Sequence, residues 1–104
     1  MKRVGFKMKL KPGYAGTYKK RHQEIWPELK ELLREAGIQD YGIWLDTETN
    51  ILFATQSLPD DFDGAKLSEA PVMKKWWKHM ADIMDTEEDF SPVTVELEEM
   101  FFMA

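Results

Sequence analysis

The order of strand and helix patterns along the chain is the strongest constraint on its fold. Near the N-terminus, alternate apolar residues indicate a strand with one apolar face: Val4, Phe6, Met8 and Leu10. A helical pattern, two strands, a second helical pattern and a last strand follow. This β-α-β-β-α-β order predicts an α+β, ferredoxin-like domain, in which both main helices cover one face of an antiparallel four-stranded sheet. We expect the first and third strands to be central.

The first helical pattern runs from about Tyr14 to Ala36. On a helical wheel with about 100° per residue, eight of its residues fall within one mostly apolar arc. These residues are Tyr18, His22, Ile25, Trp26, Leu29, Leu32, Leu33 and Ala36. Pro27 falls on the opposite side, and we expect it to kink or restart the helix because proline lacks a backbone donor. Gly37 is the expected C-terminal stop.

The middle of the chain predicts a β-hairpin. Its first strand places Tyr41, Ile43 and Leu45 on one face, and the polar residues 46–50 form the turn. Residues 51–55 alternate again and form the second strand. A loop follows, and we expect it to run into a short helical turn.

Pro71 is well placed to begin the second main helix. Its apolar arc contains Val72, Met73, Trp76, Trp77, Met80, Ile83 and Met84. Lys78 and Asp82 are spaced as an i,i+4 ion pair on the far side of this helix. The alternation of residues 93–102 predicts the last strand.

Composition narrows the class of protein. The 104 residues form one expected domain, spanning residues 1–104. There is no cysteine, so disulfides and thiolate chemistry are excluded, and the net charge of −5 argues against a nucleic-acid partner. No apolar run approaches the roughly 18 residues of a membrane span, and no signal peptide is evident. We expect a cytoplasmic protein with no nucleic-acid or membrane partner.

His22 lies inside the apolar arc of the first helix, four residues after Tyr18. Residues i and i+4 are neighbours on a helix, so an imidazole and a phenol are expected to point together toward the interior. One interpretation is a structural histidine, hydrogen-bonded to Tyr18 or to a carbonyl group. The other is a general acid or base in a pocket.

Aromatic residues supply the other candidates. The adjacent Trp76 and Trp77 either both belong to the core or include a ring that supports a sugar, because sugar C–H groups pack well on an aromatic face. Tyr41 is either a core residue or a ligand contact, and His79 is interpreted as surface or structural. No zinc, dinucleotide or phosphate-binding motif is present. The candidates favour a small neutral hydroxylated ligand and acid–base chemistry, without redox or phosphoryl transfer.

Several motifs together resemble a known family. Residues 18–29 read Tyr-x-x-x-His-x-x-Ile-Trp-Pro-Glu-Leu, and this pattern is similar to that of the L-rhamnose mutarotases. Further matches are Tyr41, Leu52-Phe53-Ala54, Trp76-Trp77 with Met80, and Ser91-Pro92-Val93. The resemblance covers nearly the whole chain. The loop 85–89 departs from it, because this loop is more acidic than expected of the family.

The resemblance implies an isomerase of the aldose 1-epimerase type that interconverts α- and β-L-rhamnopyranose in rhamnose catabolism without a cofactor or a metal. It implies His22 as the proton donor, and Tyr18, Tyr41, Trp76 and Trp77 as sugar-binding residues. The second proton carrier stays open between a carboxylate, Tyr18 and water. Two alternatives remain: a cofactor-free monooxygenase of the dimeric α+β barrel type, which shares this fold order, and a non-catalytic sugar-binding or regulatory module.

A homodimer is also expected. The predicted helices cover one sheet face, so Trp44, which alternates with Tyr41 and Leu45, should lie on the other face with Met100 and Phe102. Exposed apolar patches of this kind mark interfaces, and twofold symmetry is the commonest closure. The fold class is therefore expected to be of the dimeric α+β barrel type.

Overall fold

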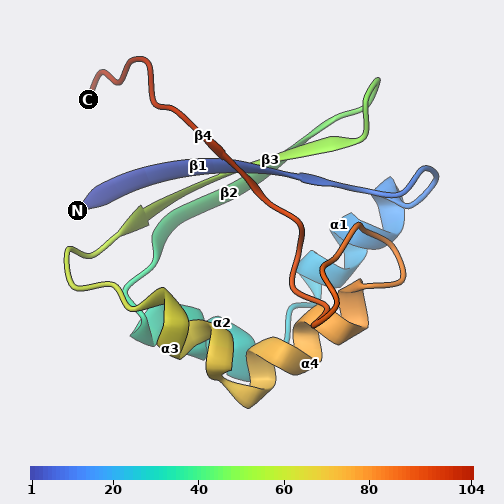
Figure 1. Ribbon diagram of the computed structural model, residues 1–104, viewed down its shortest axis with the longest axis horizontal. Helices are drawn as coiled ribbons and strands as arrows, with labels where there is room; N and C mark the ends of the chain where they lie inside the picture. Colours follow the sequence, from blue (N-terminus) through green and yellow to red (C-terminus); the bar gives the residue numbers. More distant parts are fainter.

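Four antiparallel strands form one sheet in the computed structural model, which describes residues 1–104, and the helices lie together on one side of that sheet (Figure 1). In chain order the elements are β1 (Lys2–Lys9), α1 (Ala15–Gln23), α2 (Pro27–Glu35), β2 (Gln39–Asp46), β3 (Ile51–Leu58), α3 (Gly64–Glu69), α4 (Pro71–Met80) and β4 (Val95–Leu97). The strand order is β2-β3-β1-β4, so the first and third strands are central. The predicted α+β class and sheet order are confirmed.

The first helical pattern forms two helices. α1 ends at Gln23, and α2 begins at Pro27, which occupies the first turn where a missing N–H costs no hydrogen bond. Trp26 has extended backbone angles of φ −61° and ψ 132°, as expected of a residue that precedes proline. Of the two predicted outcomes, the structure shows a restart rather than a kink.

The second main helix is shorter than its apolar arc suggests. α4 ends at Met80, so Ile83 and Met84 lie in the turn that follows it. Both side chains are nonetheless buried, because this turn returns to the sheet: the Lys11 N–H donates to the Ile83 carbonyl at 2.9 Å, and Leu10 bridges to Met84. The prediction that Ile83 and Met84 are helical was wrong, whereas the burial that their apolar character predicted is confirmed.

Two further predictions are corrected by the structure. Asp82 lies beyond the end of α4 and pairs with Arg21 of α1 rather than with Lys78. The last strand covers only Val95–Leu97, and not residues 93–102, because it pairs with only three residues at the middle of β1. Beyond this strand, side-chain contacts instead of backbone hydrogen bonds connect the chain to β1. The Arg3 guanidinium contacts the Glu99 carboxylate at 2.8 Å and stacks on the Phe102 ring at 3.0 Å.

The core lies between the inner sheet face and the helix layer. Its buried side chains come from both layers and are Met8, Leu10, Tyr18, Leu29, Leu52, Ala54, Met73, Trp76, Met80, Ile83 and Met84. These are only 11 of the 104 residues, because the layers enclose a cavity instead of closing fully on each other. No helix has both the length and the apolar character that crossing a bilayer requires.

Gly37 at the end of α2 generates a stability prediction. Its φ of +86° is left-handed, and an added Cβ would lie 2.7 Å from Pro59 Cγ. We expect Gly37→Ala to lower the free energy of unfolding by at least about 1–2 kcal/mol, measured by chemical denaturation. The control is Gly16→Ala in α1, where an added Cβ meets nothing within 4 Å and alanine favours the helix. Unchanged stability of Gly37→Ala would contradict this account.

Candidate functional site

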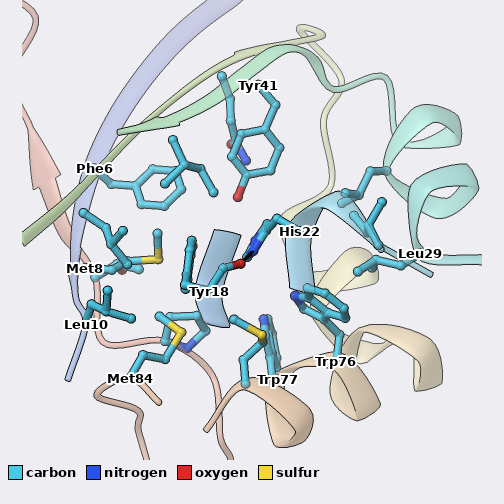
Figure 2. A pocket seen from close by; sticks show the side chains of 18 of the residues that line it. Phe6, Met8, Leu10, Tyr18, His22, Leu29, Tyr41, Trp76, Trp77 and Met84 are labelled. Carbon is cyan, nitrogen blue, oxygen red and sulfur yellow. Dashed lines mark hydrogen bonds between the residues drawn. The ribbon is translucent and has the colours of Figure 1, made fainter. Parts of the chain in front are cut away.

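A cavity of about 980 Å³ lies between the inner sheet face and the helices, as Figure 2 shows from close by. Of its 28 lining residues, 21 are hydrophobic, and the polar minority includes Tyr18, His22, Tyr41 and Gln56. A mainly apolar pocket with a few converging polar groups is typical of small-molecule sites. The cavity is therefore the candidate functional site.

α1 presents Tyr18 and His22 to the cavity from successive turns of one helix face (Figure 2). Their rings stack with centroids 4.3 Å apart and planes inclined by 26°. The His22 Nδ1 lies 3.0 Å from the Tyr18 backbone carbonyl oxygen. Because a carbonyl only accepts hydrogen bonds, Nδ1 carries the hydrogen and donates it. The Nε2 of the neutral ring therefore keeps its lone pair.

Burial changes the pKa of both groups on α1. Desolvation lowers the pKa of His22 from its ordinary 6.5, and the hydrogen bond to the Tyr18 carbonyl offsets part of this change. Burial raises the pKa of the Tyr18 phenol far above 10, and the nearby Tyr41 raises it further. At neutral pH the imidazole is thus an uncharged proton acceptor, and the phenol keeps its proton.

Tyr41 reaches the cavity from β2 beside a β-bulge. The ladder pairs Gln39 with Ser57 and Gly42 with Thr55, so Asp40 and Tyr41 together oppose the single residue Gln56. Asp40 has a positive φ of 51°, and the Tyr41 hydroxyl points into the cavity toward His22 (Figure 2). This arrangement sets two phenols and one imidazole around the same space.

Gln56 is a site residue that the sequence interpretation missed. Desolvation raises the pKa of the Tyr41 phenol, and a hydrogen bond with the Gln56 side chain acts in the opposite direction. Gln56 shares its face of β3 with the buried Leu52 and Ala54. A polar residue in an inward-facing position of an apolar strand was the signal that could have found it.

The two tryptophans of α4 both line the cavity. Trp76 is only 7% exposed, and its ring meets His22 edge-on at 5.5 Å and Trp26 edge-on at 5.1 Å. Trp76 is therefore a core residue and a cavity wall at once, whereas Trp77 is half-buried. The core and ligand interpretations are thus compatible for Trp76.

The structure brings all five sequence-predicted residues to one cavity: Tyr18, His22, Tyr41, Trp76 and Trp77. His79 is exposed and packs outside the cavity against Trp26 and Trp76. No aspartate or glutamate is among the lining residues, and the acidic loop 85–89 contributes none of them. Of the proton carriers left open by the sequence, the structure brings Tyr18 to His22 and brings no carboxylate of this chain.

Comparisons with known proteins agree with the family resemblance of the sequence motifs. A family profile described as L-rhamnose mutarotase matches residues 3–103. An L-rhamnose mutarotase of Mesorhizobium japonicum is 56% identical over 102 residues, which are 98% of this chain and 97% of that protein. One from Flavobacterium johnsoniae is 54% identical and covers 97% of this chain and 94% of its own length.

Solved structures extend the comparison to three dimensions. The crystal structure of an L-rhamnose mutarotase from Formosa agariphila matches with a TM-score of 0.92 and 47% identity over 100% of both chains. A conserved protein from Methanosarcina mazei matches with a TM-score of 0.62 over 93% of this chain and 90% of its own, but at 19% identity it shares the fold alone. With the profile match spanning nearly its whole length, this chain belongs to the L-rhamnose mutarotase family.

Proposed function

We propose that this protein is a cytoplasmic isomerase of rhamnose catabolism that interconverts the α and β anomers of L-rhamnopyranose without a cofactor. The observation that carries the proposal is the half-buried His22, whose Nδ1 is held by a backbone carbonyl while its ring faces a cavity shared with two phenols. The relatives at more than 50% identity, which are named for this activity, support the choice of substrate.

Ring opening is the first half of the proposed reaction. The anomeric hydroxyl gives its proton to His22 Nε2, the bond between C1 and the ring oxygen breaks, and the ring oxygen gains a proton. The products are the open-chain aldehyde and an imidazolium. Because the pKa values of Tyr18 and Tyr41 are raised, these phenols keep their protons and donate hydrogen bonds to sugar oxygens. We assign the proton on the ring oxygen to a solvent water, which becomes hydroxide.

Reclosure completes the cycle. After rotation about C1–C2, the C5 hydroxyl attacks the other face of the aldehyde and returns its proton to the hydroxide that formed when water protonated the ring oxygen. The His22 imidazolium then donates its proton to the former aldehyde oxygen, which becomes the new anomeric hydroxyl. His22 is thus a base in the opening half and the proton donor in the closing half. Trp76 and Trp77 bind the apolar faces of the sugar.

The first prediction of this mechanism concerns His22→Ala. We expect anomer exchange on L-rhamnose, followed by saturation-transfer NMR, to fall by about 10²–10⁴-fold, as is usual when an acid–base group is lost. Sugar binding, followed by tryptophan fluorescence, should persist. The matched control is His79→Ala, which removes the only other histidine and should keep wild-type exchange. A folded His22→Ala variant with full activity would defeat the assignment.

The second prediction concerns pH. Because burial lowers the pKa of His22, the imidazole should be neutral and active at neutral pH and should be lost as a base on acidification. After subtraction of the protein-free rate, kcat/KM measured between about pH 5 and about pH 8 should fall on the acid side with a midpoint below 6.5. A protein-dependent rate that rises as the pH falls would instead require a protonated imidazole from the start.

We also propose a twofold homodimer formed through the sheet face that points away from the helices. Trp44, Val95, Leu97 and Phe102 are exposed by 61%, 49%, 40% and 54%. In the register, Trp44 opposes Phe53 and Leu97 opposes Gly5. Phe53 alternates with the buried Leu52 and Ala54, and Gly5 precedes Phe6, which packs against the core. Their cross-strand partners Trp44 and Leu97 therefore lie on the sheet face away from the helices, although part of Trp44 also borders the cavity. Exposed apolar clusters of this kind mark protein interfaces.

The third prediction tests this dimer by light scattering. The wild-type chain should show twice its monomer mass of 12.2 kDa. Trp44→Glu and Leu97→Glu should each shift the protein toward the monomer, because each buries a carboxylate in an apolar interface. Ala65→Glu, on the exposed surface of α3, introduces the same charge and should leave the dimer intact. A wild-type monomer at micromolar concentration would refute the proposed assembly.

A further inference from the structure

α1 carries Tyr18 and His22 but has little to hold it in place. It is nine residues long, and Tyr18 is its only buried residue. Isolated helices of this length are marginal in water, so the position of α1 depends on contacts with the rest of the protein. The residues between Tyr18 and His22 are Lys19, Lys20 and Arg21, which offer no apolar face for packing.

Arg21 supplies a specific contact between α1 and the end of α4. Its Nη1 and Nη2 donate to the two carboxylate oxygens of Asp82 at 2.8 and 3.1 Å. Nη1 also donates to the backbone carbonyl of His79 at 2.8 Å. That carbonyl belongs to the last turn of α4, where backbone acceptors lack helical partners. One guanidinium therefore binds both the end of α4 and the turn that follows it.

The geometry of this contact matters more than its contribution to stability. Asp82 is 63% exposed at its side chain, and exposed ion pairs stabilise proteins only slightly. Arg21 is less exposed, at 21%, and its two-pronged geometry fixes direction as well as distance. Figure 1 shows α1 beside the C-terminal part of α4 at one end of the helix layer.

We propose that the Arg21–Asp82 pair is a positioning device that holds α1 against α4 and thereby sets His22 relative to Trp76. Arg21 directly precedes His22, so fixing its side chain fixes the rotation of the last turn of α1. Trp76 lies on α4, and its ring is 5.5 Å from that of His22. Neither Arg21 nor Asp82 lines the cavity. The inference rests on the proposed function, since it assigns a role in that reaction.

The kinetic test uses Asp82→Asn and Arg21→Met. We expect the maximal rate of L-rhamnose anomer exchange to fall by about 10–100-fold, the order expected for small misplacement of a catalytic group. KM should change little, because the sugar-binding side chains remain. Arg21→Lys should be intermediate, since lysine keeps the charge but lacks the fork. The control is Arg34→Met, which breaks the exposed contact with Glu31 at 3.5 Å and should behave as wild type.

A structural readout separates positioning from simple stabilisation. In wild type, nuclear Overhauser effects should connect the His22 ring to the Trp76 indole across the two helices and to Tyr18 within α1. In Asp82→Asn and Arg21→Met the first should weaken and the second should stay. A His22–Trp76 effect of wild-type intensity, or a wild-type maximal rate, would overturn the proposal even if thermal stability fell. Inactive wild-type protein would refute the proposed function, while this NMR comparison would still decide the positioning role.

Discussion

The break before Pro27 is the constraint on which the arrangement of the site depends. Without this break, residues 14–36 would form one continuous helix, and its polar first half and apolar second half would share a single axis. Because the chain is extended at Trp26, the two halves take different roles. α2 packs its apolar side chains, including the buried Leu29, into the core, whereas α1 presents Tyr18 and His22 to the cavity.

The electrostatics of the site follow from where these groups lie. Desolvation favours the uncharged form of every titratable group, so it lowers the pKa of His22 and raises those of Tyr18 and Tyr41. All three are consequently uncharged at neutral pH. A pocket whose imidazole and phenols are neutral suits a neutral polyol, because hydroxyl groups can donate to the imidazole and accept from the phenols. Desolvation therefore determines both the charge of these three groups and the preference of the site for an uncharged ligand.

Local patterns predicted much of this structure. Alternation and helical periodicity gave the element order and the sheet arrangement, and the i,i+4 spacing of Tyr18 and His22 correctly placed both on one face. All five residues that the family resemblance implied line the cavity. These features depend on neighbours in the sequence, which is why they can be derived without knowing the fold.

The missed features depend on contacts between distant segments. α4 ends at Met80 because the chain must turn back to the sheet, and Asp82 then meets Arg21, which lies 61 residues earlier. β4 pairs only with Gly5–Lys7 of β1, so the strand ends where this pairing ends. Gln56 was overlooked because its importance comes from Tyr41 on the adjacent strand. In each case the deciding partner lies outside the local pattern.

The cavity has a thermodynamic consequence for the folded state. Much of the space between the two layers is open to ligand instead of being filled by side chains, and few residues are fully buried. A sugar bound there completes packing that the chain does not provide for itself. Because a ligand that binds only the folded state shifts the folding equilibrium by mass action, the resistance of this protein to unfolding and to proteolysis should follow the concentration of its own substrate. Scarcity of the sugar would thereby shorten the lifetime of the protein that acts on it.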